Sequence, residues 1–372
     1  MTTDDLVLVG HPYAPIGMGE HVRCSYRAFR SVAVAPKLYD IYRMNDPDDG
    51  MRSELGDALT DRLGAVNVWH INGDEVRPVL ERIDSVRTPG SYDIVYPAWE
   101  LARYPREWAE QLERFDEVWT PTDFIRDAIA PAVSKPVVSM PLACEVLLTG
   151  FLGRRAFGIP EDHYAFLFFF DFRSYASRKN PGAVVEAFER AVRERPTART
   201  SLVIKLNGAE NEPKAHAELA ERLRPLAHRV VLLARTMTDN EVKNLVRVCD
   251  CFVSLHRSEG FGRGLSEAMF LGKPVIGTGY SGNMQFMTPD IALIVDHTLV
   301  PVPAGAYPHW QDQVWADPDV AQAARHMVAL LDDRALGRRL GEAASLALRK
   351  GFGYRPVGMR YLHRLETLGI LR

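Results

Sequence analysis

Two glutamates with seven residues between them, Glu259 and Glu267, are the side chains of this chain best suited to chemistry. An apolar segment, 251–255, predicts a buried strand before them, and a glycine-rich turn leads into a segment with helical periodicity, 265–271. In α/β proteins ligands bind at the carboxyl ends of parallel strands, so we expect both carboxylates at a binding edge. The glycines would let a ligand approach the backbone closely. Carboxylates near backbone N–H groups suit a ligand that has many hydroxyls and an anionic group, such as a nucleotide sugar.

A basic turn after another apolar strand is the second candidate, and it supplies the cations Arg173, Arg178 and Lys179. It ends in Asn180 and Pro181, a pattern typical of a helix N-cap followed by proline in the first helical position. Cations at the end of a strand and beside a helix N-terminus would bind an anion such as a pyrophosphate. Taken alone, however, the pattern is more typical of a solvated basic turn.

The composition of the chain limits its class. With 372 residues it is long enough for two or three domains, or for two of above-average size. A hydrophobic content of 47% and a charged content of 25% are typical of a soluble globular protein. The net charge of −3 argues against a nucleic-acid-binding protein. We expect no transmembrane segment, because the longest apolar runs, such as 165–170, have only the length of strands.

The cysteines and the N-terminal residues indicate a reducing compartment. The cysteines show neither metal-ligand nor disulfide spacing, and we expect core or strand positions for Cys24, Cys144, Cys249 and Cys251. Residues 1–6 lack the basic and apolar regions of a signal peptide. We therefore expect a cytoplasmic protein with reduced thiols.

Strand-like and helix-like segments alternate along the chain, which predicts an α/β protein with parallel, doubly wound sheets. The predicted strands are 6–10, 36–40, 65–71, 92–97, 117–120, 136–140, 165–171, 201–206, 230–234, 251–256 and 273–277. The predicted helices are 20–31, 106–114, 123–130, 181–194, 212–223, 239–248, 263–271, 319–331, 334–350 and 357–368. Because one sheet cannot hold all these strands, we expect two domains, 1–150 and 151–354, with the boundary within 144–163.

The segment around the two glutamates resembles the E-x(7)-E signature of retaining glycosyltransferases of family 4, which have the GT-B fold. The likeness includes the EGFG turn that begins at Glu259, the Ala-Met pair after Glu267, and the next predicted strand, 272–276. It covers most of the second domain and the first domain only loosely. The resemblance implies two Rossmann-like domains facing a central cleft, and a C-terminal helix, about 355–372, that crosses back to the first domain. A break in the helical pattern at 351–356 fits that crossover.

The resemblance also implies roles for residues of the second domain. Arg173 and Lys179 match the Arg and Lys that relatives place against the donor's phosphates, with Arg178 as a third cation. They would catalyse the transfer by stabilising the charge that develops on the leaving oxygen. Glu259 would accept hydrogen bonds from sugar hydroxyls, and Glu267 would hold the ribose hydroxyls. The glycine-rich turn and the segment where relatives grip the base complete the donor-binding set: Gly260, Phe261, Gly262, Gly264, Leu265, Thr236 and Met237.

The first domain supplies candidates for the acceptor side. The loop after the first predicted strand contains Gly17 and Gly19, resembles the glycine-bearing loop of the same family, and would approach the phosphate or the acceptor. His11 in this loop is either a base on the acceptor side or a structural histidine. Glu100 follows a tryptophan at the end of another strand, and it is either an acid that contacts the acceptor or an exposed residue beside a packing Trp.

Two further patterns invite other interpretations. The segment 277–282 fits the dinucleotide pattern G-x-G-x-x-G, but Pro289 comes too soon for the required helix, and no acid lies about 20 residues on. Asp46 and Asp48 match the D-x-D metal motif of the other glycosyltransferase fold, but an acidic, proline-bearing stretch is more typical of a surface turn. The resemblance therefore implies an enzyme without metal ion or cofactor, in which cationic side chains replace the ion.

These observations predict a metal-independent, retaining glycosyltransferase of the hexosyltransferase type. It would move a sugar from a nucleotide diphosphate sugar to a hydroxyl acceptor. No carboxylate stands out as a nucleophile, so we expect front-face substitution. The resemblance implies that the leaving phosphate takes the acceptor's proton. The alternatives are a nucleotide-sugar epimerase of the same fold and a non-catalytic protein that binds sugar nucleotides. The intact set of acids and cations argues against the non-catalytic alternative.

The acceptor stays open, and so do the donor's base, its sugar and the oligomeric state. A polysaccharide, a lipid-linked oligosaccharide and a small molecule all fit the sequence as acceptors. Residues 101–115 mix Trp and Leu with Arg, which would allow peripheral contact with the inner face of a membrane. The near balance of acids and bases in this segment is more typical of an ordinary amphipathic helix over a core.

Overall fold

The computed structural model describes residues 5–43, 49–83 and 87–370, and the chain divides into two compact units. Unit 1 contains residues 1–144 and 350–372, and unit 2 contains residues 145–349. Each unit has one six-stranded sheet in which all neighbouring strands are parallel. The predicted α/β architecture with two doubly wound sheets is confirmed.

The sheet of unit 1 has the strand order β2-β1-β3-β4-β5-β6. Its strands are β1 (Leu6–Gly10), β2 (Lys37–Asp40), β3 (Val66–Trp69), β4 (Tyr92–Val95), β5 (Glu117–Thr120) and β6 (Val137–Ser139). The helices of this unit are α1 (Gly17–Arg30), α2 (Asp49–Leu55), α3 (Gly73–Ile83), α4 (Arg106–Leu112), α5 (Asp123–Ile129) and α13 (Tyr354–Thr367). Thr122 starts α5 as its N-cap, since its side chain accepts a hydrogen bond from the backbone N–H of Ile125.

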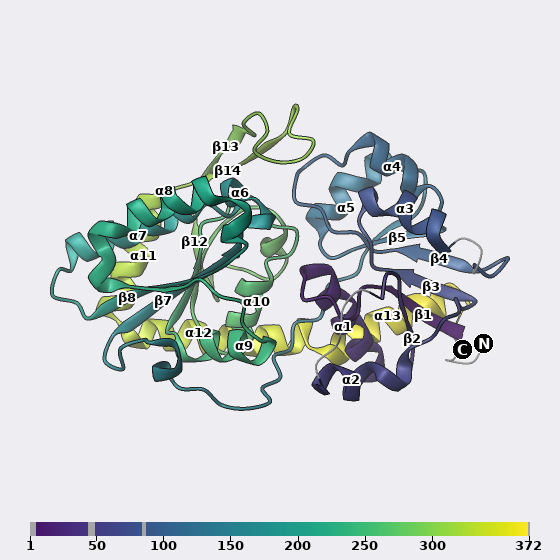
Figure 1. Cartoon of the computed structure of the whole chain (residues 1–372), viewed down its shortest axis with the longest axis horizontal. Helices are drawn as coiled ribbons and strands as arrows, with labels where there is room; N and C mark the ends of the chain where they lie inside the picture. The colour runs from purple at the N-terminus through teal and green to yellow at the C-terminus, as the bar shows by residue number, and fades with distance from the viewer. Residues whose placement is uncertain (1–4, 44–48, 84–86, 371–372) are drawn as a thin grey trace. The chain divides into compact units, whose positions relative to one another are not determined.

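The C-terminal helix α13 is part of unit 1 and packs against α1 (Figure 1). Tyr361 is fully buried, stacks on Trp119 of β5 and donates a hydrogen bond of 3.1 Å to the carbonyl of Pro141. Arg364 donates two hydrogen bonds, of 2.9 and 2.6 Å, to the buried carboxylate of Glu117. The helix therefore completes the core of the unit.

The predicted break before the last helix is wrong in its extent. The preceding helix, α12 (Arg334–Phe352), continues through Gly351, and only Gly353 separates it from α13. Pro356 does not interrupt the pattern, because it lies in the first turn of α13, where backbone N–H groups have no partner within the helix.

The sheet of unit 2 has the strand order β12-β11-β10-β7-β8-β9. Its strands are β7 (Tyr164–Asp171), β8 (Thr200–Asn207), β9 (Val230–Leu233), β10 (Cys251–Ser254), β11 (Val275–Thr278) and β12 (Leu293–Val295). The helices are α6 (Ala176–Lys179), α7 (Pro181–Glu194), α8 (Pro213–Leu223), α9 (Asp239–Val248), α10 (Arg263–Phe270), α11 (Val320–Asp332) and most of α12. Both ends of α7 and of α9 agree with the prediction, since proline starts α7 and a capping box at Thr238 starts α9.

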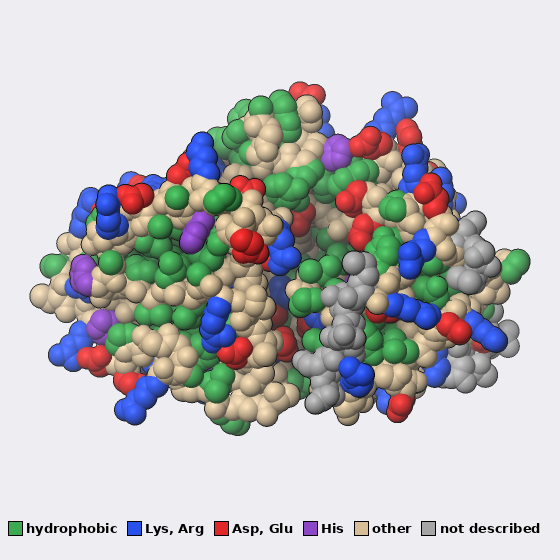
Figure 2. Space-filling view, in the orientation of Figure 1, with side chains coloured by type: hydrophobic (Ala, Val, Ile, Leu, Met, Phe, Trp, Pro, Cys, Tyr) green, Lys and Arg blue, Asp and Glu red, His purple; other side chains and the backbone are tan. Residues whose placement is uncertain are grey.

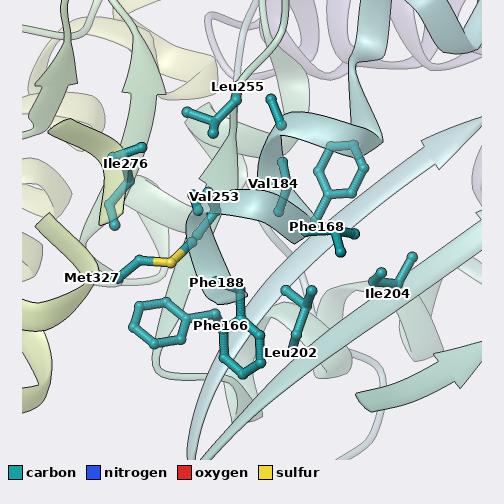
Figure 3. Close-up of a cluster of buried hydrophobic side chains, with 14 of the residues drawn as sticks. Phe166, Phe168, Val184, Phe188, Leu202, Ile204, Val253, Leu255, Ile276 and Met327 are labelled. Carbon is teal, nitrogen blue, oxygen red and sulfur yellow. The ribbon is translucent and has the colours of Figure 1, made fainter. Parts of the chain in front are cut away.

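One face of this sheet is apolar and forms the core of unit 2. Alternate side chains of the strands, such as Phe166 and Ile204, pack against α7, α8 and α11, where Phe188 and Met327 meet them (Figure 3). Because successive residues of a strand point to opposite faces, the residues between them lie on the other face.

The other face of the sheet is partly polar at its carboxyl-terminal end. Phe169 and Asp171 of β7 pair in register with Lys205 and Asn207 of β8, so the four side chains share this face. The neighbouring α9 and α10 supply Val242 and Leu265 to a cavity at this end, described below. This face therefore presents polar side chains where ligands bind in α/β proteins.

A two-stranded antiparallel ribbon, β13 (His297–Pro301) and β14 (Val314–Pro318), was not predicted. In the described part of the chain these two strands pair only with each other (Figure 1). The segment between them contains Tyr307. Prolines at 301, 303 and 308 hide the strand pattern in the sequence.

Surface charge and thiols agree with the composition. Acidic and basic side chains are interspersed over the visible face of each unit (Figure 2). The four cysteines are buried, as expected for core or strand positions, and they form no disulfide among the described residues: Cys24, Cys144, Cys249 and Cys251.

Candidate functional site

The sheet of unit 2 has a topological switch point between β7 and β10. The chain continues from β7 to β8 on one side of this point and from β10 to β11 on the other. Ligands of α/β proteins bind at such points, beyond the carboxyl ends of the strands. The segment after β7 carries Arg178 and Lys179, and the segment after β10 carries Glu259. The topology therefore brings the two predicted site segments together.

Glu259 is the centre of an ion-pair cluster at this point. Its Oε1 accepts a hydrogen bond of 2.5 Å from Lys179 Nζ, and its Oε2 lies 3.4 Å from Arg178 Nη1. The same Nη1 donates 2.9 Å to the carbonyl of Ser258, which ties the arginine to the loop of Glu259. Burial alone would raise the pKa of Glu259, but the charges of Lys179 and Arg178 outweigh it and lower the pKa to about 2. The carboxylate is therefore ionised near neutral pH.

The loop after β11 fixes the backbone of Glu259. The amide of Glu259 donates 2.8 Å to Ser281 Oγ, and the amide of Gly282 donates 2.8 Å to the carbonyl of Glu259. Asn283 links this loop to the end of β10, because its Oδ1 lies 2.9 Å from Nε2 of the buried His256. These contacts hold the carboxylate in one place.

The turn between Glu259 and α10 requires glycine at Gly262. This residue has a backbone φ of +90°, a conformation that residues other than glycine rarely adopt. It directly precedes α10, whose N-terminus carries a positive partial charge that favours an anionic ligand.

A cavity of about 290 Å³ lies at this edge of unit 2. Five of the predicted site residues line it: Lys179, Glu259, Gly262, Gly264 and Leu265. It is also lined by residues to which the sequence analysis gave no role, among them Asp171, Lys205, Asn207, Val242, Ser254 and Arg263. Concave, partly apolar surroundings with a few convergent charges are typical of a small-molecule site.

Other predicted donor-side residues are described by the structure but do not line this cavity: Arg173, Arg178, Glu267, Gly260, Phe261, Thr236 and Met237. Phe261 and Met237 are buried, Thr236 is exposed, and Glu267 is half-buried on α10. Phe261 packs against Phe286, with 5.2 Å between the ring centroids.

Arg173 is engaged by an acid two residues before it. Its Nη2 lies 2.7 Å from Asp171 Oδ2, and its Nε donates 3.0 Å to Asp171 Oδ1. Burial would raise the pKa of Asp171, but the hydrogen bonds from Arg173 outweigh it and lower the pKa. With 57% of its side chain exposed, Arg173 lies at the rim of the site while Asp171 lines the cavity.

The first-loop candidates of unit 1 lie at the start of α1. Gly17 is the first residue of that helix, and Gly19 lies in its first turn. His11 is buried, and its Nε2 lies 3.1 Å from Oε1 of Glu75 on α3. The histidine therefore has a structural partner within unit 1.

Glu100 and the segment that follows it belong to the covering of unit 1. Glu100 is half-buried beside Trp99, which is 2% exposed and packs against aromatic rings of the same segment. Ala109, Leu112 and Phe115 are also buried. The apolar side of this amphipathic segment is thus covered by its own unit.

The ribbon of β13 and β14 contributes to the site in a way that the sequence did not indicate. The ring of Tyr307 lies 4.8 Å from that of Tyr175, and Arg178 Cζ lies 5.7 Å from the centroid of the same Tyr307 ring. Ser177 Oγ donates 2.9 Å to the carbonyl of Ala306. The segment between the two strands of the ribbon therefore contacts α6 and Arg178, one of the two cations that pair with Glu259.

The structure bears on one of the two competing patterns. After β11 the segment 277–282 leads only into a short 3-10 helix, Gly282–Gln285, so its rejection as a dinucleotide motif is confirmed. Asp46 and Asp48 lie outside the described residues. Within the described ranges, no group of three or more His, Cys, Asp or Glu side chains is arranged to hold a metal ion. None of the helices in those ranges is long and apolar enough to cross a membrane.

Comparison with protein families assigns this chain to a family. The family "Glycosyl transferases group 1" matches residues 154–346, more than half of the 372-residue chain. The chain belongs to this family and is a glycosyltransferase. Comparison with the curated proteins gives no match.

Solved structures share the fold over nearly the whole chain. Anabaena HepE in complex with UDP and glucose has 11% identity and a TM-score of 0.68, covering 97% of this chain and 99% of its own. Sucrose-phosphate synthase from Thermosynechococcus elongatus has 14% identity and a TM-score of 0.69, covering 98% and 99%. A glycosyltransferase from Rickettsia africae has 14% identity and a TM-score of 0.63, also covering 98% and 99%. The two sheets therefore have the GT-B fold.

Proposed function

We propose that the protein is a retaining glycosyltransferase of the family 4 type. It transfers a sugar from a nucleoside diphosphate sugar to a hydroxyl acceptor in the cytoplasm, without a metal ion. The observation that carries this proposal is the ion pair of Lys179 and Glu259 in the wall of a cavity at the switch point, beside the N-terminus of α10. The complexes of HepE with UDP and glucose and with UDP-glucose support a donor of this class.

Lys179 supports the departure of the nucleoside diphosphate. When the bond between the anomeric carbon and the diphosphate oxygen breaks, its electron pair stays on that oxygen. A fixed ammonium group and the positive end of α10 stabilise this charge more in the transition state than in the ground state. The acceptor oxygen bonds to the anomeric carbon on the same face of the sugar, and its proton passes to the leaving phosphate oxygen.

Glu259 orients the sugar in this proposal. Its pKa of about 2 keeps it ionised, so it accepts hydrogen bonds from sugar hydroxyls and does not act as a general acid. Arg178 is buried and bonded to Ser258 and Glu259, which suits a residue that positions this carboxylate. The roles of Arg173 at the phosphates and of Glu267 at the ribose stay predictions.

The first test is calorimetric titration of nucleoside diphosphates into the folded protein. We expect binding of at least one of them, weakened about tenfold or more in Lys179→Met, because a charge-assisted hydrogen bond to phosphate is lost. Lys214→Met is the matched control, since Lys214 is an exposed lysine of the same unit. If the folded wild-type protein bound no nucleoside diphosphate, the proposal would be wrong.

Retention is checked on the sugar that the enzyme releases by slow hydrolysis of the donor. NMR should detect first the anomer that has the configuration of the donor. The opposite anomer at early times would contradict the retaining mechanism while leaving donor binding intact.

A further inference from the structure

Lys205 and Asn207 are two polar side chains of the cavity that the proposed mechanism does not use. They lie two residues apart near the end of β8, so they point to the same face of the sheet. Both line the cavity, together with the apolar side chains of Phe169, Val242 and Leu265.

Both side chains have unused hydrogen-bonding capacity. Lys205 is 6% exposed, and its Nζ makes no hydrogen bond or ion pair with the residues that the structure describes. Burial lowers its pKa, and the charge of Asp171 on the neighbouring strand opposes this shift. Asn207 Oδ1 is buried and likewise has no hydrogen-bond partner in the described part of the chain. Buried polar atoms are nearly always paired, so Asn207 Oδ1 and a lysine on the same face of the sheet, both without a partner among the described residues, indicate a ligand.

The other residues of the cavity lining suggest which part of the ligand this pair meets, since Thr236 and Met237, where the resemblance places the base, do not line the cavity. If the proposed function holds, the diphosphate lies near Lys179 and the N-terminus of α10, which line the cavity from the loops. The apolar lining residues Phe169, Val242 and Leu265 offer contacts to a flat aromatic heterocycle, and Lys205 and Asn207 line the same cavity.

We propose that Lys205 and Asn207 read the base of the donor nucleotide and select a base with a ring N–H beside a carbonyl. An ammonium group only donates hydrogen bonds, and an amide oxygen only accepts them. Lys205 Nζ donates to the carbonyl oxygen, and Asn207 Oδ1 accepts the neighbouring ring N–H. Uracil, guanine and hypoxanthine present this edge. Cytosine and adenine present an amino group beside a ring nitrogen without a hydrogen. With these bases Lys205 Nζ would face the amino group, which is also a donor, and Asn207 Oδ1 would face the ring nitrogen, which is also an acceptor.

The test compares nucleotides that differ only at this edge. UDP and CDP form one matched pair, and IDP and ADP form the other. Calorimetry on the wild-type protein should give tighter binding of UDP than CDP, and of IDP than ADP, by about tenfold or more. Lys205→Met and Asn207→Leu should each bring these ratios toward one, whereas Lys214→Met, an exposed lysine of the same unit, should leave them unchanged.

The outcomes separate this inference from the function on which it rests. A loss in Lys205→Met that is equal for all four nucleotides would mean that Lys205 contacts phosphate, and it would overturn the base-reading role. Tighter binding of CDP or ADP by the wild-type protein would overturn it too, although the protein would still bind nucleotides. Absence of binding for all four and also for GDP and dTDP, with the circular dichroism spectrum of a folded protein, would refute the proposed function itself.

Discussion

At the scale of the residue, the site depends on one buried carboxylate between two cations. Glu259 would be costly to bury alone, but Lys179 and Arg178 lower its pKa from 4.5 to about 2. A group with a lowered pKa stabilises the folded state at pH values above its ordinary pKa, and this contribution is lost as the pH falls through the folded value. The charge to which we assign the orientation of the sugar is therefore also a charge that stabilises the folded loop.

Glu259→Gln should remove both the proposed orientation of the sugar and the stabilisation that comes from the charge of Glu259. The lowered pKa corresponds to about 3 kcal/mol at neutral pH, and the variant should be less stable than the wild type by about that amount. The difference should be constant above about pH 5 and should vanish as the pH approaches 2. Urea denaturation at a series of pH values measures it, with exposed Glu218→Gln as the control. A difference that persisted unchanged at pH 2 would show that charge is not its source.

The residues of the site could be predicted from the sequence only in part. Glu259 and Lys179 were found because they follow apolar strands at the expected spacing, and parallel strands place such loops on one edge. The sequence analysis gives Lys205 no role, because it lies inside a strand whose apolar residues predict burial. A single lysine within an apolar strand could have indicated a ligand. The phosphate-binding role of Arg173 stays a prediction, and the sequence pattern did not indicate its ion pair with Asp171 at the rim.

At the scale of the element, the cavity needs α10 to lie close to the sheet. Gly264 is in the first turn of this helix, where a Cβ atom would lie 2.7 Å from Phe252 Cζ and 2.9 Å from Phe169 Cζ. Both rings also line the cavity. The packing of the helix and the shape of the wall are thus coupled.

Gly264→Ala should therefore push the rings or the helix apart. We expect a loss of about 1–3 kcal/mol in the free energy of unfolding, typical of an overpacked core, with weaker nucleotide binding. Gly153→Ala is the control, because nothing lies within 4 Å of its Cβ position and its φ is negative. Chemical denaturation and calorimetry measure the two effects. Unchanged stability and affinity would mean that the rings move aside freely.

Helices with a strong hydrophobic periodicity were predictable from the sequence. Elements that are positioned by contacts with residues distant in the sequence were not. The helices α7 and α9 are amphipathic and carry N-terminal start signals. The sequence therefore located both helices with the bounds that the structure shows. The ribbon of β13 and β14 has no such signal, and its function in the site comes from Tyr307 meeting Arg178, which is 129 positions earlier. Local rules cannot supply a contact of that kind.

At the scale of the whole molecule, each unit has its own core, and the last helix belongs to the first unit. The carboxylate of Glu117 has no exposed surface and accepts two hydrogen bonds from Arg364. Its other donors among the described residues are neutral, the hydroxyl of Tyr92 and the indole N–H of Trp119. Removing the guanidinium would leave a buried charge without its counter-charge, which is strongly destabilising.

Arg364→Ala should therefore destabilise unit 1 by about 3 kcal/mol and leave the core of unit 2 intact. Four of the six tryptophans lie in unit 1, so fluorescence reports mainly on that unit, and circular dichroism reports on both. We expect the fluorescence midpoint to move to lower denaturant and the dichroism transition to broaden or split. Arg360→Ala, at an exposed position of the same helix, should move neither. If both probes moved together by the same amount, the two units would unfold as one, and the stability of α13 would then be shared by the whole chain.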